Sequence, residues 1–180
     1  VAGTIALSIS TFYDVQYGVF FVVYPLMLMS LVPMFNLHVA RQFIFSAAVN
    51  CVEMVLIVGY LSQWPVIMTL VVFALYVMRF RFMSQGPLFL LGSMGVVCQS
   101  TMLNFMSYPT SNWHTLMFSN MEACVMAVAL SALLHYLIPD VEPRKPPPRI
   151  EKDAARIRHE SLLSGTVATI IFVVFQICDL

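Results

Sequence analysis

Residues 42–60 read QFIFSAAVNCVEMVLIVGY, an apolar run that holds a single charged side chain, Glu53. A helix needs about 20 mostly apolar residues to cross the hydrocarbon core of a bilayer. Six further segments have this character, and the full set is 1–13, 17–34, 42–60, 62–78, 86–106, 115–137 and 162–178. We therefore predict an all-α, polytopic transmembrane helix bundle with six spans and the start of a seventh.

The composition agrees with a membrane protein and argues against a soluble one. Hydrophobic residues make up 60% of the chain and charged residues 10%, whereas a soluble domain has about 25% charged residues. The net charge of zero gives no attraction to nucleic acid. The four cysteines lie inside apolar runs without a CxxC pair, so they predict neither a disulfide framework nor a zinc site. We expect a lipid bilayer as partner, and no cofactor, metal or nucleic acid.

The basic residues all fall in alternate connections between the predicted spans. They are Arg41, Arg79, Arg81, Arg144, Lys145, Arg149, Lys152, Arg156 and Arg158. The other connections carry aromatic side chains instead, namely Tyr13, Tyr17, Tyr60, Trp64, Tyr108 and Trp113. Basic loops face the cytoplasm and aromatic belts mark membrane interfaces. The pattern predicts a multi-pass protein whose basic connections are cytoplasmic.

A change in composition separates residues 139–160 from the apolar segments around them. Prolines stiffen the start of this connector, and residues 151–160 are charged enough to form a short helix before the seventh span. A cytosolic, solvated linker explains the composition better than a binding motif does, because topology alone requires a basic connector here.

The first and seventh spans share a short sequence echo. Residues 3–6 read GTIA and residues 165–168 read GTVA, at the place where a six-helix unit would restart. The chain also starts without Met and ends inside an apolar run. We therefore expect a fragment of a two-half transporter, with a first transmembrane half at 1–138, the linker at 139–160 and the first helix of a second half at 161–180.

Polar side chains at membrane depth are the candidate functional residues. Glu53 lies near the middle of the third span and Glu122 in the outer third of the sixth, and both are candidates for proton coupling because charged groups there are costly. Spacings of 4, 4 and 3 place a polar stripe on the face of Glu53, formed by Gln42, Ser46 and Asn50. Gln99 belongs to a comparable stripe on the fifth span, with Gly92 and Gly95. The alternative is that these stripes only hold helices together.

Basic residues next to the spans suggest a second feature, a cytoplasmic mouth that attracts anions. Its candidates are His38, Arg41, Arg79 and Arg81. The simpler alternative is that the arginines only anchor helix ends. We find no phosphate loop, nucleophile elbow or His-Glu zinc motif, so no catalytic residue is assigned and an enzyme is not expected.

Several short motifs, in order, resemble one family of membrane proteins. They are YGVFF at 17–21 with Tyr24-Pro25, VPMFNLHVARQF at 32–43, RFR at 79–81, GPL at 86–88 and YLIPDVEP at 136–143. Together they resemble the DUF2955 proteins, a branch of the fusaric acid resistance and aromatic acid exporter superfamily. The resemblance runs over most of the chain.

The resemblance implies a function as well as a location. It implies a bacterial inner-membrane protein with two transmembrane halves that exports aromatic carboxylic acids or similar compounds. It also implies a periplasmic adaptor of the membrane-fusion type and proton-driven transport. Our leading hypothesis is efflux of small organic acids, and the alternatives are an anion channel and a non-transporting membrane scaffold. The protein could act as a homo-oligomer.

Overall fold

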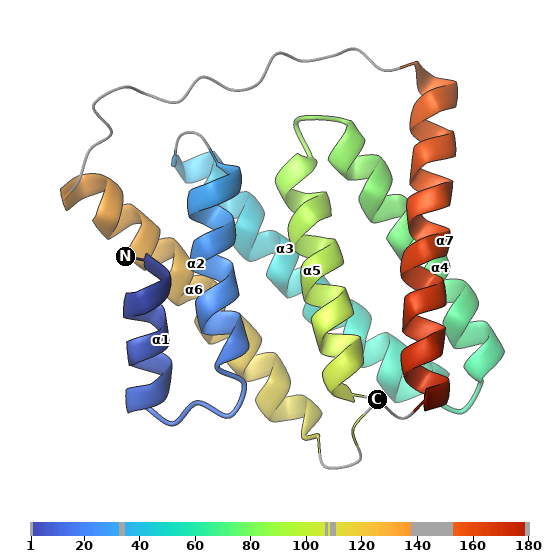
Figure 1. Ribbon diagram of the computed structural model, residues 1–180, viewed down its shortest axis with the longest axis horizontal. Helices are drawn as coiled ribbons and strands as arrows, with labels where there is room; N and C mark the ends of the chain where they lie inside the picture. Colours follow the sequence, from blue (N-terminus) through green and yellow to red (C-terminus); the bar gives the residue numbers. More distant parts are fainter. Residues whose placement is uncertain (1, 33–34, 107, 109–110, 138–152, 179–180) are drawn as a thin grey trace. The chain divides into compact units, whose positions relative to one another are not determined.

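The computed structural model is built from helices (Figure 1). It describes residues 2–32, 35–106, 108, 111–137 and 153–178, and no strand occurs within them. The elements are α1 (Ala2–Phe12), α2 (Val19–Leu31), α3 (Leu37–Leu56), the π-helical turn η1 (Ile57–Leu61), α4 (Pro65–Ser84), α5 (Phe89–Met106), α6 (Trp113–Leu137) and α7 (Ala154–Cys178). The predicted all-α class is confirmed.

Five of these helices are long and apolar enough to cross a membrane: α3 with η1, α4, α5, α6 and α7. The other two, α1 and α2, are apolar but shorter. A helix of 13 residues such as α2 is about 20 Å long, against a hydrocarbon core of about 30 Å. The structure thus supports a multi-pass membrane protein, while the count of six spans plus a seventh stays a prediction.

Two helix boundaries differ from the hydropathy prediction, each for a local reason. α3 begins at Leu37, earlier than predicted, because the Asn36 side chain accepts a hydrogen bond from the Val39 backbone N–H at 2.9 Å and caps the helix. α4 continues past residue 78 to Ser84, so Arg79 and Arg81 lie inside the helix rather than after it. The turn that follows uses Gly86 at a φ of 65°, a conformation that suits glycine.

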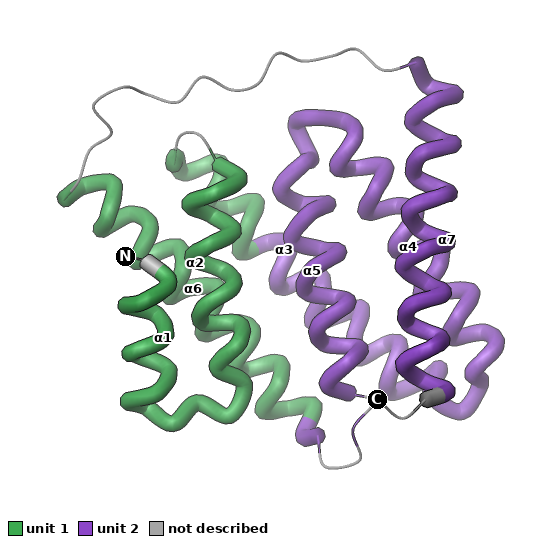
Figure 2. The backbone as a smooth tube through the Cα atoms, viewed as in Figure 1, with its two compact units in different colours: residues 1–44, 113–148 green, residues 45–112, 149–180 purple. Residues whose placement is uncertain are grey.

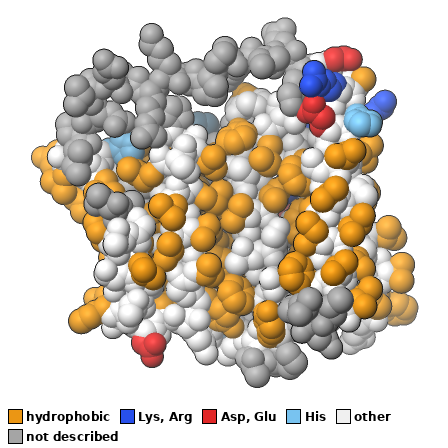
Figure 3. All heavy atoms as spheres, viewed as in Figure 1, with side chains coloured by type: hydrophobic (Ala, Val, Ile, Leu, Met, Phe, Trp, Pro, Cys, Tyr) orange, Lys and Arg blue, Asp and Glu red, His pale blue; other side chains and the backbone are white. Residues whose placement is uncertain are grey.

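The charged segment before the seventh span forms the first turns of α7 itself. Residues 139–152 of the predicted connector lie outside the described residues, but the helix is continuous from Ala154 to Cys178. Figure 3 shows charged side chains at the N-terminal end of α7 and apolar ones along the rest of it. Within the charged part, Arg156 and Glu160 form an exposed ion pair of 2.8 Å. The predicted short charged helix is therefore an extension of the span.

The chain divides into two compact units that are interleaved along the sequence (Figure 2). Unit 1 comprises residues 1–44 and 113–148, and unit 2 comprises residues 45–112 and 149–180. Within unit 2, α7 packs against α4. The division into 1–138, 139–160 and 161–180 stays a prediction. The predicted repeat stays a prediction.

Small residues are prominent in the helix packing of unit 1. α2 packs against both α1 and α6. On α6 a seam of small residues is buried, with Ala123, Ala127 and Ser131 all at 1% exposure or less. On the other side of α2, an added side chain at Gly3 would come within 3.1 Å of Leu26. Close approach of small residues therefore organises this unit, as is usual for helices in lipid.

In unit 2, α4 is the central helix, and it packs against both α5 and α7. The close approach on the α7 side occurs at Gly165, where an added Cβ would lie 2.5 Å from Cγ2 of Val77. Ser161 and Thr169 lie one turn either side of Gly165 and are buried as well. α4 also contacts the π-helical turn η1, and α5 contacts α7 as well.

Candidate functional site

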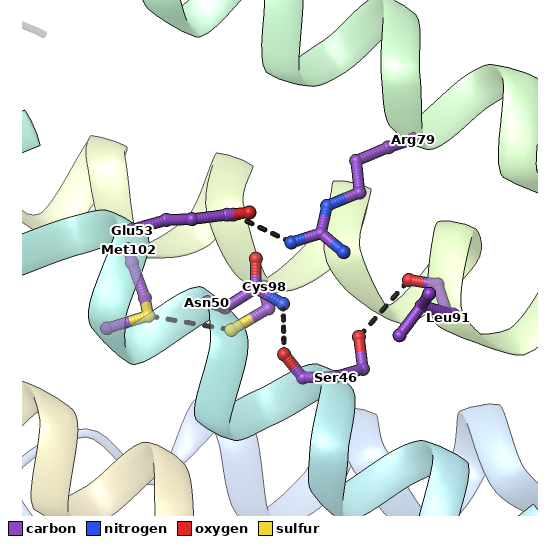
Figure 4. Close-up of polar contacts among 7 residues, drawn as sticks. All are labelled: Ser46, Asn50, Glu53, Arg79, Leu91, Cys98 and Met102. Carbon is purple, nitrogen blue, oxygen red and sulfur yellow. Dashed lines mark hydrogen bonds and ion pairs between the residues drawn. The ribbon is translucent and has the colours of Figure 1, made fainter.

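The most unusual contact in unit 2 is a buried ion pair between Glu53 of α3 and Arg79 of α4 (Figure 4). Nη2 of Arg79 donates to Oε2 of Glu53 at 2.7 Å, a distance typical of a charge-assisted hydrogen bond. The Arg79 side chain is 1% exposed and that of Glu53 14% exposed. Both residues belong to helices long and apolar enough to span a bilayer. The pair therefore places two opposite charges among apolar helices.

The two side chains meet because of their directions on the helices. α3 and η1 lead into α4 through the short connection at residues 62–64, and Arg79 lies farther from that connection than Glu53 does. Side chains lean toward the N-terminus of their own helix. Arg79 consequently leans toward the connection and Glu53 away from it, so the two groups converge between the helices.

Two glycines of α5 make room for Arg79. An added Cβ at Gly95 would lie 2.6 Å from both Cδ and Nε of Arg79. At Gly92 it would lie 2.5 Å from the backbone oxygen of Arg79 and 2.7 Å from the backbone nitrogen of Met83. The glycine stripe predicted on the fifth span thus lets α5 approach the backbone of α4. At Gly95 it also lets the Arg79 side chain lie directly against the backbone of α5.

Part of the predicted polar stripe lies next to the ion pair on α3. Oγ of Ser46 donates to the backbone oxygen of Leu91 in α5 at 3.1 Å, and Nδ2 of Asn50 donates to the backbone oxygen of Ser46 at 2.8 Å (Figure 4). Both side chains are buried. Gln42, the first residue predicted for the stripe, is half-buried and belongs to unit 1.

Several polar atoms in this part of unit 2 have unused hydrogen-bonding capacity. Nε of Arg79 and Oδ1 of Asn50 are buried and have no hydrogen-bond partner among the described residues. Gln99 lies one turn after Gly95 on α5 and is 1% exposed. Neither the oxygen nor the nitrogen of its side-chain amide has a hydrogen-bond partner among the described residues. Buried polar groups without partners are rare and call for an explanation.

This arrangement is suited to binding a carboxylate. A guanidinium offers five N–H donors in a planar fork that matches a carboxylate bidentately, and only one of its nitrogens is bonded to Glu53. An anion approaching Arg79 would therefore find a preformed donor group. Among the described residues, no group of three His, Cys, Asp or Glu side chains could hold a metal ion.

Arg79 differs from the expectation of an open cytoplasmic mouth, because its side chain is buried and paired. The other three mouth candidates, His38, Arg41 and Arg81, are exposed. His38 and Arg41 lie in the first turns of α3, in unit 1, whereas Arg81 lies on α4 in unit 2. Sequence reasoning had placed Arg79 outside the span because hydropathy treats an arginine as the end of a membrane segment.

The second proton-coupling candidate, Glu122, has a different environment from Glu53. It lies on the exposed side of α6, while Ser119, Ala123 and Cys124 beside it are buried. Ser119 and Glu122 are three residues apart, yet they lie on a buried and an exposed side of α6. Glu122 and Glu53 also lie in different units.

Sequence reasoning missed one buried polar contact, in unit 1. The Tyr24 hydroxyl donates a hydrogen bond to Oδ1 of Asn120, and both side chains are 0% exposed. Phe43 packs edge-on against the Tyr24 ring, at 5.7 Å between centroids. Asn120 lies three residues before Ala123, and this spacing places it on the small-residue seam of α6. That position was the signal in the sequence from which the burial of Asn120 could have been predicted.

Comparison with known proteins gives one result. The family model described as "Protein of unknown function (DUF2955)" matches residues 1–134. Neither the curated proteins nor the solved structures gave a match. The matched range includes α3, α4 and α5, and so contains the whole of the Glu53–Arg79 site.

Proposed function

Since the chain belongs to the DUF2955 family, described as of unknown function, and buries an ion pair among apolar helices, we propose that it transports small organic acids across a membrane. The observation that carries the proposal is the Glu53–Arg79 pair. A buried ion pair adds little stability, and well-packed apolar residues often replace one without loss. A role beyond packing gives a reason to keep two charges at this position.

The proposed chemistry is an exchange of carboxylates at Arg79. An organic acid anion replaces Glu53 as the partner of the guanidinium, which is the natural ligand for a carboxylate. Glu53 would then be a buried charge without a counter-charge, a costly state, so it takes up a proton. Binding of the anion is in this way linked to protonation of Glu53.

Charge neutrality also determines which way the proton moves relative to the substrate in this scheme. One anion on Arg79 and one proton on Glu53 occupy the site together, so the two move together. Proton-driven efflux, expected from the family resemblance, instead needs protons to move inward while the substrate leaves. That would require a charged Glu53 beside a bound anion, leaving the site with a net negative charge. The pair therefore favours co-movement of anion and proton.

The test uses the full-length protein in liposomes, with a panel of aromatic carboxylates and simultaneous recording of internal pH. The neutral double variant Glu53→Gln with Arg79→Gln keeps the hydrogen-bonding groups and removes both charges. We expect it to lower transport at least about tenfold, since a charge-assisted contact contributes about 1.5–3 kcal/mol. The matched control is Arg156→Gln with Glu160→Gln, which removes an exposed pair of the same unit and should leave transport unchanged.

Unchanged transport by a folded Glu53/Arg79 double variant would remove the pair from the mechanism. Flux that follows the membrane potential alone, without proton movement, would favour an anion channel. Binding of an adaptor protein without any flux would favour a scaffold.

The wider setting follows from the resemblance and the charge pattern. We propose a bacterial inner-membrane location, with the basic connections in the cytoplasm and a periplasmic membrane-fusion adaptor as partner. Membership of the aromatic acid exporter superfamily and aromatic carboxylic acids as substrates belong to the same proposal. Support for them comes from the short motifs and from the one-sided distribution of Lys and Arg.

A further inference from the structure

One face of α6 is exposed from residue 118 to residue 136. Its residues are spaced 4, 3, 4, 3 and 4 apart, and all of them are exposed: Phe118, Glu122, Val125, Ala129, Ala132 and Tyr136. We call this face the outer seam of α6. Alternating steps of three and four residues are the heptad spacing with which two helices pack side by side. A helix with one side toward lipid shows a similar spacing, so the residue types have to distinguish an interface from a lipid-facing side.

The exposed side of α7 shows what a lipid-facing side of this protein looks like. Between residues 162 and 174 its exposed residues are large and aliphatic apart from one threonine: Leu162, Leu163, Thr166, Val167, Ile170, Ile171 and Val174. The Thr166 hydroxyl donates to the backbone oxygen of Leu162 at 2.8 Å, so its hydrogen is already used. The outer seam of α6 instead contains a carboxyl group and two alanines. Small and polar residues are typical of contacts between membrane helices.

Glu122 is the residue of the outer seam that lipid tolerates least. It lies about 13 Å along α6 from Trp113, where the helix begins, and therefore well inside a hydrocarbon core of about 30 Å. Its side chain is exposed and has no hydrogen-bond or ion-pair partner among the described residues. A carboxyl group that faces hydrocarbon is costly. We therefore expect a surface that offers a hydrogen bond at this depth to cover Glu122.

A second copy of the chain meets this requirement without any further group. Two copies in the same orientation, related by a two-fold axis along the membrane normal, bring each seam residue to the same depth as its counterpart. Glu122 of one copy then faces Glu122 of the other. A carboxyl group that carries a proton donates one hydrogen bond and still accepts another. Two such groups at one site share protons, as paired carboxyl groups do, and need no cation.

The alanines of the outer seam allow this contact to form. Ala129 and Ala132 follow Glu122 by seven and ten residues, on the same face. Because both side chains are small, the backbones of two helices can approach closely enough for the carboxyl groups to meet. From the spacing, the alanines and the carboxyl group together, we infer that α6 pairs with α6 of a second copy through the outer seam. Glu122 forms the polar contact of this dimer.

The first test is disulfide cross-linking of the full-length protein in liposomes. Ala129→Cys places a thiol in the outer seam, and Val167→Cys places one on the exposed side of α7 as the matched control. A disulfide requires Cα atoms within about 7 Å of each other. We expect oxidation to produce a covalent dimer of the Ala129→Cys protein. The Val167→Cys protein should give no more dimer than the unsubstituted protein, which measures the background from the native cysteines.

The second test measures the monomer–dimer equilibrium, by energy transfer between donor-labelled and acceptor-labelled copies as the protein is diluted with lipid. Glu122→Leu removes the polar group and should weaken dimerisation about tenfold, the effect of a hydrogen bond between membrane helices. Glu122→Gln keeps a donor and an acceptor on one side chain and should dimerise within a few-fold of the wild-type protein. Thermal unfolding of both variants, measured in parallel, separates lost dimerisation from lost folding.

Three results would overturn the inference. The first is no covalent dimer of Ala129→Cys above the level of Val167→Cys, which would leave lipid, another protein or another segment of the same chain as the cover of this face. The second is unchanged dimerisation of a folded Glu122→Leu variant. The third is a loss of dimerisation in Glu122→Gln as large as that in Glu122→Leu. Neither experiment measures transport, so its outcome is independent of the role proposed for Glu53 and Arg79.

Discussion

Each unit buries a prominent side-chain contact between helices, and these two contacts differ in charge. In unit 1 the Tyr24 hydroxyl bonds to the Asn120 amide, and both groups are neutral. In unit 2 the Arg79 guanidinium bonds to the Glu53 carboxylate, and both groups are charged. Tyr24, Asn120 and Arg79 are all at 1% exposure or less, and Glu53 is 14% exposed. The two contacts therefore differ little in burial and mainly in their chemistry.

The comparison separates polar residues that hold helices together from those that need another explanation. A neutral hydrogen bond between membrane helices contributes about 0.6 kcal/mol on average and is a sufficient reason for Tyr24 and Asn120. A charge at membrane depth costs about 2.5–3.5 kcal/mol on insertion scales. Packing alone therefore does not explain the ion pair. The predictions below test this difference between the neutral and the charged contact.

The largest effect is expected from breaking the charged contact on one side only. Glu53→Gln leaves Arg79 buried without a counter-charge and should destabilise the protein by about 3–5 kcal/mol. Adding Arg79→Gln should recover most of that loss, because the unpaired charge is gone. Thermal or denaturant unfolding of the purified protein measures both. A double variant as unstable as the single one would show that the pair itself, rather than the unpaired charge, controls stability.

An intermediate effect is expected at the glycines of α5. Gly92→Ala would force a side chain against the backbone of α4 and should cost about 1–3 kcal/mol. Gly95→Ala should cost less, because it meets the Arg79 side chain, which can shift. Gly59→Ala is the matched control, since nothing lies within 4 Å of an added Cβ there. Equal unfolding temperatures for Gly92→Ala and Gly59→Ala would contradict the close approach of α5 to α4.

The smallest effect is expected in unit 1. Tyr24→Phe removes the hydroxyl that bonds to Asn120 while keeping the ring against Phe43, so it should destabilise the protein by only about 0.6 kcal/mol and at most about 1.7 kcal/mol. The same unfolding measurement applies. A loss as large as that from Glu53→Gln would erase the distinction between the two units.

Hydropathy was enough to predict the helices, but not where each one ends. The apolar runs predicted seven helical segments, and all seven are helical in the described residues. The end of α4 was predicted too early because the method assumes that arginine faces water. Arg79 can be buried there because Glu53, on another helix, supplies a counter-charge. Such a pairing depends on three-dimensional contacts that no single segment reveals.

The candidate site was predicted only in part for the same reason. Spacing on one helix placed Ser46, Asn50 and Glu53 on a common face, and the structure buries Ser46 and Asn50 and nearly buries Glu53. The partner of Glu53 is 26 residues away in sequence, and the spacing rule cannot relate residues on different helices.

The π-helical turn at Ile57–Leu61 gives the end of α3 a tolerance in length that the regular part of the helix lacks. A π turn holds one residue more than the α-helical hydrogen-bonding pattern would, and each residue in an α-helix turns the chain by about 100°. Deleting one residue within the turn would convert it to an α turn, and the chain that follows would keep nearly the same orientation. Deleting one residue between Glu53 and the turn would instead rotate the start of α4 and turn Arg79 away from Glu53. We therefore expect the loss of one residue to be tolerated in the π turn and to misalign the ion pair when it falls just before it.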